Sequence, residues 1–233
     1  RHVVAATARL AAQFMAAGFV HGVLNSDNIN VTGESFDYGP WRFLPRWDPG
    51  FTAAYFDHAG LYAFGRQPEA IQWDVAQLAG CLALIGEAPA LSDLLASWPA
   101  RFEAALIDRL LARLGIARTG EAVDRKLVSA VLAALRSRLV GIDRFFFDWR
   151  GGRVPQGEAY RNDAFDDLRL RLEGQQQVLT HAYWSDTAPC SMLIDEVEAI
   201  WASIAEADEW SPFDEKIAAI RRMGDAMTAD AVA

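Results

Sequence analysis

From residue 68 onward, apolar residues recur at spacings of three and four, and this pattern constrains the fold more than any other feature of the sequence. Ile71, Val75, Leu78 and Leu82 fall on one face of a helix, and Pro68 suits the first turn of that helix. The same spacing predicts further helices over residues 89–114, 120–140, 160–174, 190–206 and 213–224.

The N-terminal part of the chain contains both helix and strand signals. Residues 2–17 are rich in Ala and predict a helix that ends at Gly18. Residues 29–31 and 35–38 predict two short strands joined by a tight turn at Gly33. The sequence is therefore expected to fold as a mainly α protein with a small β-hairpin.

The charge balance restricts the partners of the protein. The 233 residues contain 22 Lys and Arg against 31 Asp and Glu, which gives a net charge of -9. A field of this sign repels phosphate backbones and anionic lipid surfaces, so we expect neither nucleic acid nor a membrane as a partner. A nucleotide would need a metal ion or local basic groups to offset the repulsion.

Two features bear on the cellular setting and on the extent of the chain. Two cysteines cannot form a disulfide framework, and we expect Cys81, in an apolar run, to be buried and Cys190 to be an unreactive free thiol. Unpaired thiols and the lack of a visible export signal favour the cytoplasm. The chain opens at Arg1 in a run typical of a helix interior, so we expect further sequence upstream.

Polar residues cluster between positions 21 and 40, namely His21, Asn25, Asp27, Asn28 and Asp37. A hairpin over this region would bring Asn28 and Asp37 together at its open end. Side-chain oxygens held side by side suit Mg²⁺, which completes its coordination with phosphate oxygens and water. The sequence therefore predicts a magnesium site at Asn28 and Asp37.

The same spacing matches the metal-binding parts of a protein kinase. His21 and Asn28 fall on the ends of the kinase catalytic loop, and Asp37-Tyr38-Gly39 takes the place of the Asp-Phe-Gly turn. The position of the kinase proton acceptor, however, is occupied by Val23. A valine accepts no proton, so ordinary phosphorylation is disfavoured, as is the related chemistry of small-molecule phosphotransferases.

The motifs of this region closely resemble those of the selenoprotein O family, also called YdiU. Residues 21–28 read His-Gly-Val-Leu-Asn-Ser-Asp-Asn, and residues 36–40 read Phe-Asp-Tyr-Gly-Pro. The resemblance continues through residues 48–51 and 60–64 and covers roughly residues 1–85.

The resemblance implies a protein-kinase-like fold and a function. Family members bind ATP and transfer AMP to hydroxyl side chains of proteins, with Mg²⁺, or Mn²⁺ as a second candidate, as cofactor. By motif position, Asp27 would accept the proton, Asn28 would bind the metal, and Asp37 would bind both metal and nucleotide. His21 and Asn25 have no such assignment; His21 is expected to hold the loop, and Asn25 either orients the loop or contacts substrate.

The resemblance also implies a domain organisation. The chain would be one kinase-like C-lobe, with the metal-binding loop and an activation-segment-like region over residues 1–67 and a helical body over residues 68–233. The Gly-rich segment and the nucleotide-binding Lys of the family belong to a preceding lobe that these residues lack, so the isolated lobe is expected to be inactive. The alternative is a catalytically silent pseudokinase lobe that serves as a protein-interaction module.

Overall fold

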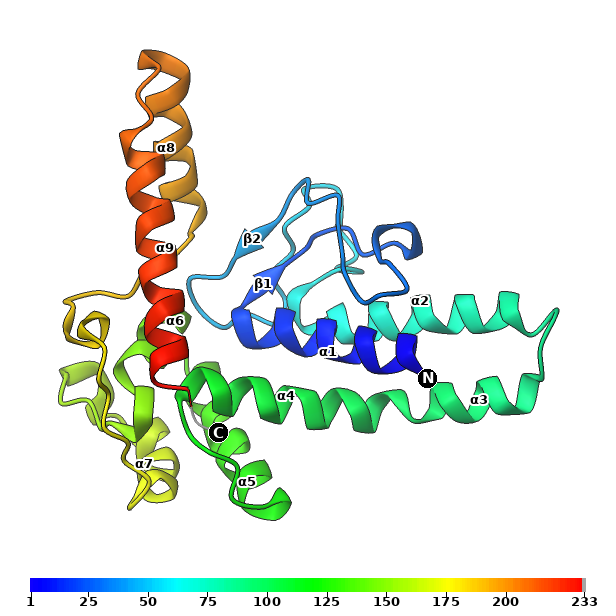
Figure 1. The fold of residues 1–233 in the computed structure, drawn as a ribbon, viewed down its shortest axis with the longest axis horizontal. Coiled ribbons are helices and arrows are strands. Elements are labelled where there is room, and N and C mark those ends of the chain that lie inside the picture. The colour runs from blue at the N-terminus through cyan, green and yellow to red at the C-terminus, as the bar shows by residue number, and fades with distance from the viewer. Residues whose placement is uncertain (232–233) are drawn as a thin grey trace. The chain divides into compact units, whose positions relative to one another are not determined.

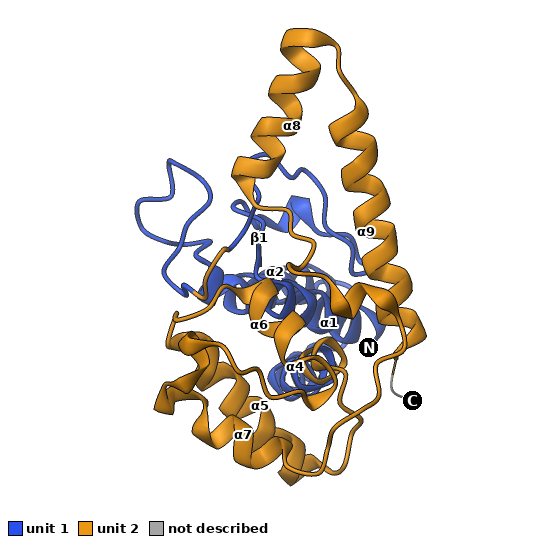
Figure 2. Cartoon of the chain, turned by 90° about the vertical axis from the view of Figure 1, so that its left-hand side faces the viewer, with its two compact units in different colours: residues 1–44, 48–109 blue, residues 45–47, 110–233 orange. Residues whose placement is uncertain are grey.

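A computed structural model describes residues 1–231, and the chain within it is mainly helical with one small antiparallel sheet. It divides into two compact units (Figure 2). Unit 1 comprises residues 1–44 and 48–109, and unit 2 comprises residues 45–47 and the residues from 110 onward. The candidate residues of the sequence all lie in unit 1.

Unit 1 is built on two helices that pack against each other, α1 and α2 (Figure 1). Small side chains on α1, among them Ala8 and Ala11, are fully buried and allow the close approach. Gly18 ends α1 with a φ of 69°, as the sequence predicts. The elements that begin in this unit are α1 His2–Ala17, β1 Phe19–Val20, β2 Arg42–Phe43, α2 Gln67–Leu82, α3 Ala88–Ala96 and α4 Trp98–Leu114.

The small sheet differs from the predicted hairpin in its position. The chain reverses where expected, with a turn in which the Gly33 N–H donates to the carbonyl of Asn30 at 2.9 Å, but only a single antiparallel bridge joins Ile29 and Ser35. The ladder forms instead between β1 and β2, which pair Phe19 with Phe43. The aromatic rings of this pair lie 5.2 Å apart, and such cross-strand packing stabilises short strands.

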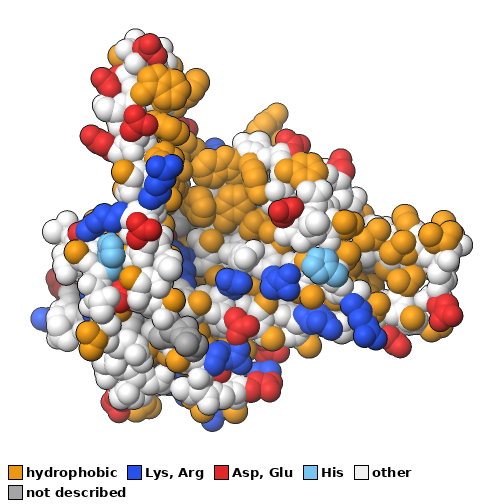
Figure 3. All heavy atoms as spheres, in the orientation of Figure 1, with side chains coloured by type: hydrophobic (Ala, Val, Ile, Leu, Met, Phe, Trp, Pro, Cys, Tyr) orange, Lys and Arg blue, Asp and Glu red, His pale blue; other side chains and the backbone are white. Residues whose placement is uncertain are grey.

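The end of α2 corrects one expectation. Cys81 is exposed, not buried, because the buried face of α2 lies nearer its start, at Ile71 and Val75. Residues 80–90 are all exposed, and hydrophobic side chains gather over the far ends of α2 and α3, at the right of Figure 3. An apolar run buries a thiol only where another element packs against it.

Unit 2 gathers its core around an aromatic segment. Phe145, Phe146, Phe147 and Trp149 are all buried. The helices of this unit after α4 are α5 Glu121–Arg136, α6 Ile142–Asp148, α7 Asp166–Leu172, α8 Ile194–Ala207 and α9 Ser211–Ala229. In Figure 1 α8 and α9 form a helical hairpin.

Two predicted helices are interrupted for local reasons. The segment 89–114 forms α3 and α4, which divide at Ser97, and Pro99 occupies the first turn of α4, where a missing N–H is tolerated. The segment 160–174 is helical only over α7. Before it, the Asn162 side chain accepts a hydrogen bond from the Ala164 N–H at 3.0 Å and stabilises a turn in place of a continuous helix.

Candidate functional site

His21 holds the predicted metal-binding loop in place. Its side chain is fully buried, and its backbone N–H donates to the Gln67 side chain at 2.9 Å. The Val23 N–H points at Nδ1 of the ring at 3.4 Å, so Nε2 carries the proton and donates to the Phe36 carbonyl at 2.9 Å. Burial lowers the pKa of His21, which keeps the ring neutral, so His21 ties the loop to the residue before Asp37.

Asn28 lies at the end of a short 3-10 turn, Ser26–Asn28, and is 6% exposed. Its Nδ2 donates to the Val23 carbonyl at 2.9 Å, which fixes the orientation of the amide. Its backbone carbonyl accepts the Phe36 N–H at 3.2 Å. No hydrogen bond to the amide oxygen Oδ1 is found among the described residues, so this atom is available to a ligand.

Asp37 follows the residue that pairs with Asn28. Its side chain is exposed, and its φ of 60° marks a sharp change of chain direction after Phe36. The negative charge of Asp37 acts on His21, which opposes the lowering of the His21 pKa. The backbone pairing therefore places Asp37 and Asn28 at neighbouring positions across the reversal, although the strands themselves are shorter than expected.

Asp27 is exposed on the same turn as Asn28. The turn is closed by a hydrogen bond from the Asn28 N–H to the Asn25 carbonyl at 2.9 Å. The Asp27 carboxyl is thus open to a reactant and is not sealed against the interior.

Two residues near this turn were missed by the sequence reasoning. The hydroxyl of Tyr62 donates to the Asn25 side chain across 37 positions of sequence. Asp74 on α2 is 7% exposed, and neither of its carboxyl oxygens has a hydrogen-bond partner within residues 1–231. Burial, and then the charge of Asp27, raise the pKa of Asp74 to about 7. Neither the contact of Tyr62 nor the burial of Asp74 follows from a local sequence pattern. Both arise because α2 and the loop before it pack beside the turn.

A partly open pocket of about 260 Å³ lies beside the same turn. Ser26 and Asp74 contribute to its wall, and apolar side chains from α1, α2 and residues 29–31 form most of the rest. The two oxygens of Asp74 each have less than 1 Å² of exposed surface, so the pocket does not present them to a ligand.

The donor atoms of the site suit a hard cation. Within residues 1–231, no group of three His, Cys, Asp or Glu side chains gathers as a metal site. A cation held at Asn28 and Asp37 would therefore receive an amide oxygen and a carboxylate and draw its other ligands from water or substrate. Mg²⁺ is commonly bound in this way, with few protein oxygens and several waters or phosphates, so the residues present fit it.

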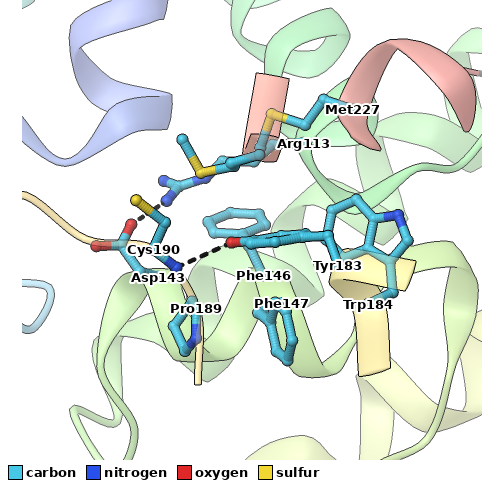
Figure 4. Close-up of a pocket in the computed structure, with 10 residues that line it drawn as sticks. Arg113, Asp143, Phe146, Phe147, Tyr183, Trp184, Pro189, Cys190 and Met227 are labelled. Atoms are coloured by element: carbon cyan, nitrogen blue, oxygen red, sulfur yellow. Dashed lines mark hydrogen bonds and ion pairs between the residues drawn. The ribbon is translucent and has the colours of Figure 1, made fainter. Parts of the chain in front are cut away.

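Unit 2 holds a cavity of about 20 Å³, shown in Figure 4, which has room for about one water molecule. An ion pair between Arg113 and Asp143 lies beside Cys190, whose backbone N–H donates to the Tyr183 hydroxyl at 2.9 Å. Burial raises the pKa of the Cys190 thiol, which leaves it protonated and agrees with the expectation that it is unreactive. This cavity is a packing feature of the core.

None of the described helices combines the length and the apolar character needed to cross a membrane.

Comparison with known proteins shows the family of this chain. The model of the family described as protein adenylyltransferase SelO matches residues 1–221. The chain is 36% identical over 240 residues to the protein nucleotidyltransferase YdiU of Gloeobacter violaceus, an alignment that covers 95% of this chain and 50% of the relative. It is also 36% identical over 227 residues to the YdiU of Myxococcus xanthus, covering 91% of this chain and 46% of that protein.

A third relative has a higher sequence identity over a shorter stretch. The YdiU of Rhodococcus jostii is 43% identical over 139 residues, which cover 57% of this chain and 27% of the relative. The alignments to the first two relatives cover most of this chain. The chain thus spans about half the length of those curated relatives.

Proposed function

This chain belongs to the SelO family of protein adenylyltransferases, and on that basis we propose that the protein containing it transfers AMP from ATP to hydroxyl side chains of other proteins. The observation that carries the proposal is the turn Ser26–Asn28. It presents the exposed carboxylate of Asp27 next to Asn28. The backbone carbonyl of Asn28 accepts a hydrogen bond from Phe36, the residue before Asp37.

The residues take distinct roles in this reaction. Asp27 accepts the proton of the attacking hydroxyl while the oxygen of that hydroxyl bonds to the α-phosphorus of ATP. The bond from the α-phosphorus to pyrophosphate breaks, and pyrophosphate leaves. Asn28 and Asp37 hold Mg²⁺, or Mn²⁺ as a second candidate, and Asp37 also contacts the nucleotide. When bound, the cation offsets the charge on the phosphates, which a protein with a net charge of -9 would otherwise repel.

The residue at position 23 separates this reaction from that of a kinase. Val23 is half-buried, and its backbone carbonyl accepts the hydrogen bond from the Asn28 side chain. Its side chain supplies no proton acceptor, whereas the carboxylate of Asp27 is exposed four residues later. The sequence thus moves the available base from the kinase position to a position beside the metal-binding amide.

The wider architecture is part of the proposal. We assign the chain to a kinase-like C-lobe, with the loop region over residues 1–67 and the helical body over 68–233, and we assign the phosphate-gripping groups to a preceding lobe. The family match favours the transferase over the protein-interaction module that the sequence left open.

The proposal is tested by supplying the gene product that contains this chain with ATP labelled on the α- or the γ-phosphate, in the presence of Mg²⁺. Label from α-labelled ATP should appear on protein, and label from γ-labelled ATP should not. Transfer from γ-labelled ATP alone would show kinase chemistry and reject the proposal.

The site assignment is tested with Asp37→Ala. This change removes a ligand of the metal and a contact of the nucleotide, so labelling should fall by at least about 100-fold, a loss typical for an essential electrostatic group. Asp93→Ala, which removes an exposed carboxylate from α3, is the matched control and should leave labelling unchanged. Full activity of Asp37→Ala would remove the metal assignment.

A further inference from the structure

The hydroxyl of Tyr62 is the feature near the site that the proposed mechanism leaves unexplained. It lies in the long loop before α2 and donates to the side-chain oxygen of Asn25. Asn25 precedes the turn that carries Asp27 and Asn28, and its backbone carbonyl closes that turn. The contact therefore joins the loop to the residue that immediately precedes the turn.

Tyr62 is itself rigidly held. Its side chain packs against the hydrophobic core to which α1 and α2 contribute. The carboxylate of Asp57 accepts the backbone N–H groups of Leu61 and Tyr62, each at 2.8 Å. The backbone and the ring are both anchored, so the hydroxyl has a fixed position from which to orient Asn25.

The surroundings of the hydroxyl favour its protonated form. Burial raises the pKa of Tyr62, and the charges of Asp74, Asp57 and Asp27 raise it further. The hydroxyl thus stays protonated at neutral pH and remains a donor to Asn25.

We infer that Tyr62 is a positioning residue, which through its hydrogen bond to Asn25 holds the turn so that Asp27 faces the incoming hydroxyl. This inference rests on the proposed function for its effect on catalysis. It also decides between the two roles that the sequence left open for Asn25, because a side chain whose oxygen accepts from Tyr62 orients the loop. The Asn28 side chain is also held by the Val23 carbonyl, so we expect the metal site to depend less on Tyr62 than the orientation of Asp27 does.

The kinetic test is a double-mutant cycle of Tyr62→Phe, Asn25→Ala and the double variant in the gene product that contains the chain. Tyr62→Phe keeps the packed ring and should lower kcat for AMP transfer about tenfold, the effect of one lost hydrogen bond, with KM for Mg²⁺–ATP within about twofold. Asn25→Ala should lose a similar factor, and the double variant should be no worse than either single variant. Tyr55→Phe, which removes a hydroxyl from an 89% exposed side chain, should leave kcat unchanged.

The outcomes separate the inference from its alternatives. Additive losses in the double variant, or a loss in Asn25→Ala far greater than in Tyr62→Phe, would show that Asn25 contacts the substrate directly and would overturn the inference. A rise in KM with unchanged kcat would overturn it as well.

A second measurement does not require activity. Amide hydrogen exchange at Asn28, whose N–H is bonded to the Asn25 carbonyl, should become faster in Tyr62→Phe and stay unchanged in Tyr55→Phe. Unchanged exchange in Tyr62→Phe would reject the positioning role. Faster exchange in a protein that transfers no AMP would instead reject the proposed function and leave the positioning role in place.

Discussion

At the scale of single residues, Asp74 shows how tertiary structure changes the chemistry of a side chain. It lies on the face of α2 that is buried, with both oxygens unpaired and the charge of Asp27 nearby. Ionising such a group costs free energy, because neither a cation nor a hydrogen-bond donor compensates the charge. The folded protein therefore holds this carboxyl protonated to a pH near 7.

The pH dependence of stability should reveal this residue. The pKa of Asp74 rises from 3.8 in the unfolded chain to about 7 in the folded protein, so the folded state retains a proton that the unfolded state has lost. The free energy of unfolding should fall between pH 4 and pH 7, by roughly 2 kcal/mol once partial solvent screening is allowed for, and level off above pH 7.

The comparison of urea unfolding for the wild type and Asp74→Asn, at steps of pH, isolates this effect. The free energy of unfolding of the variant should lack the decline between pH 4 and pH 7. Measured against the wild type, the variant should therefore be more stable at pH 8 than at pH 4. His21 acts in the opposite sense, because its lowered pKa costs stability as the pH falls below 6.5, but its contribution is common to both proteins. Parallel profiles for the two proteins would show that Asp74 is ionised throughout this range.

At the scale of elements, glycines determine how closely the loop segments approach their neighbours. Gly22 has a φ of 91°, and a Cβ there would lie 2.7 Å from Cγ of Pro40. Gly33 has a φ of 85°, and a Cβ would lie 2.6 Å from Cβ of Ala6 on α1. Only glycine combines these backbone angles with such close contacts, so the loop and the turn are both packed in ways that a side chain would prevent.

Gly22→Ala should therefore disrupt the loop that carries the candidate site. The strained backbone and the clash with Pro40 should lower the free energy of unfolding by about 1–3 kcal/mol and reduce AMP transfer. Gly80→Ala is the matched control, because the position is helical and, among the described residues, no atom beyond its chain neighbours and its own helix backbone lies within 4 Å of the added Cβ. That variant should gain up to about 1 kcal/mol. Equal stability of the two variants in urea titrations would contradict this account.

At the scale of the whole molecule, each unit depends on residues that join distant parts of its sequence. In unit 2 the buried guanidinium of Arg150 donates to the carbonyls of Ala112 and Asp230, at 2.6 and 2.9 Å, and lies 5.0 Å from the ring of Trp184. In unit 1 Trp98 donates to Thr7 across 91 positions. Such contacts connect segments that no local pattern relates.

Arg150→Met should destabilise unit 2. The substitution keeps a similar length but removes the guanidinium that donates to the carbonyls of Ala112 and Asp230, at a cost of about 2–4 kcal/mol. Hydrogen exchange should become faster mainly among the amides of unit 2. Arg161→Met, at an exposed position, should change the free energy of unfolding by less than about 0.5 kcal/mol. Equal effects of the two substitutions would show that Arg150 is not a structural tie.

The sequence by itself determined where several of the helices lie and which residues are candidates for the site. Apolar spacing predicted α2 and α5, Gly18 predicted the end of α1, and the motif around Asp27 and Asn28 predicted the family, because each of these signals is local in the chain. Only the tertiary structure decided that the ladder forms between β1 and β2, that Cys81 is exposed, and that Tyr62 contacts Asn25. Those features depend on which segments pack together, and packing partners that are distant in sequence leave no periodic trace in it.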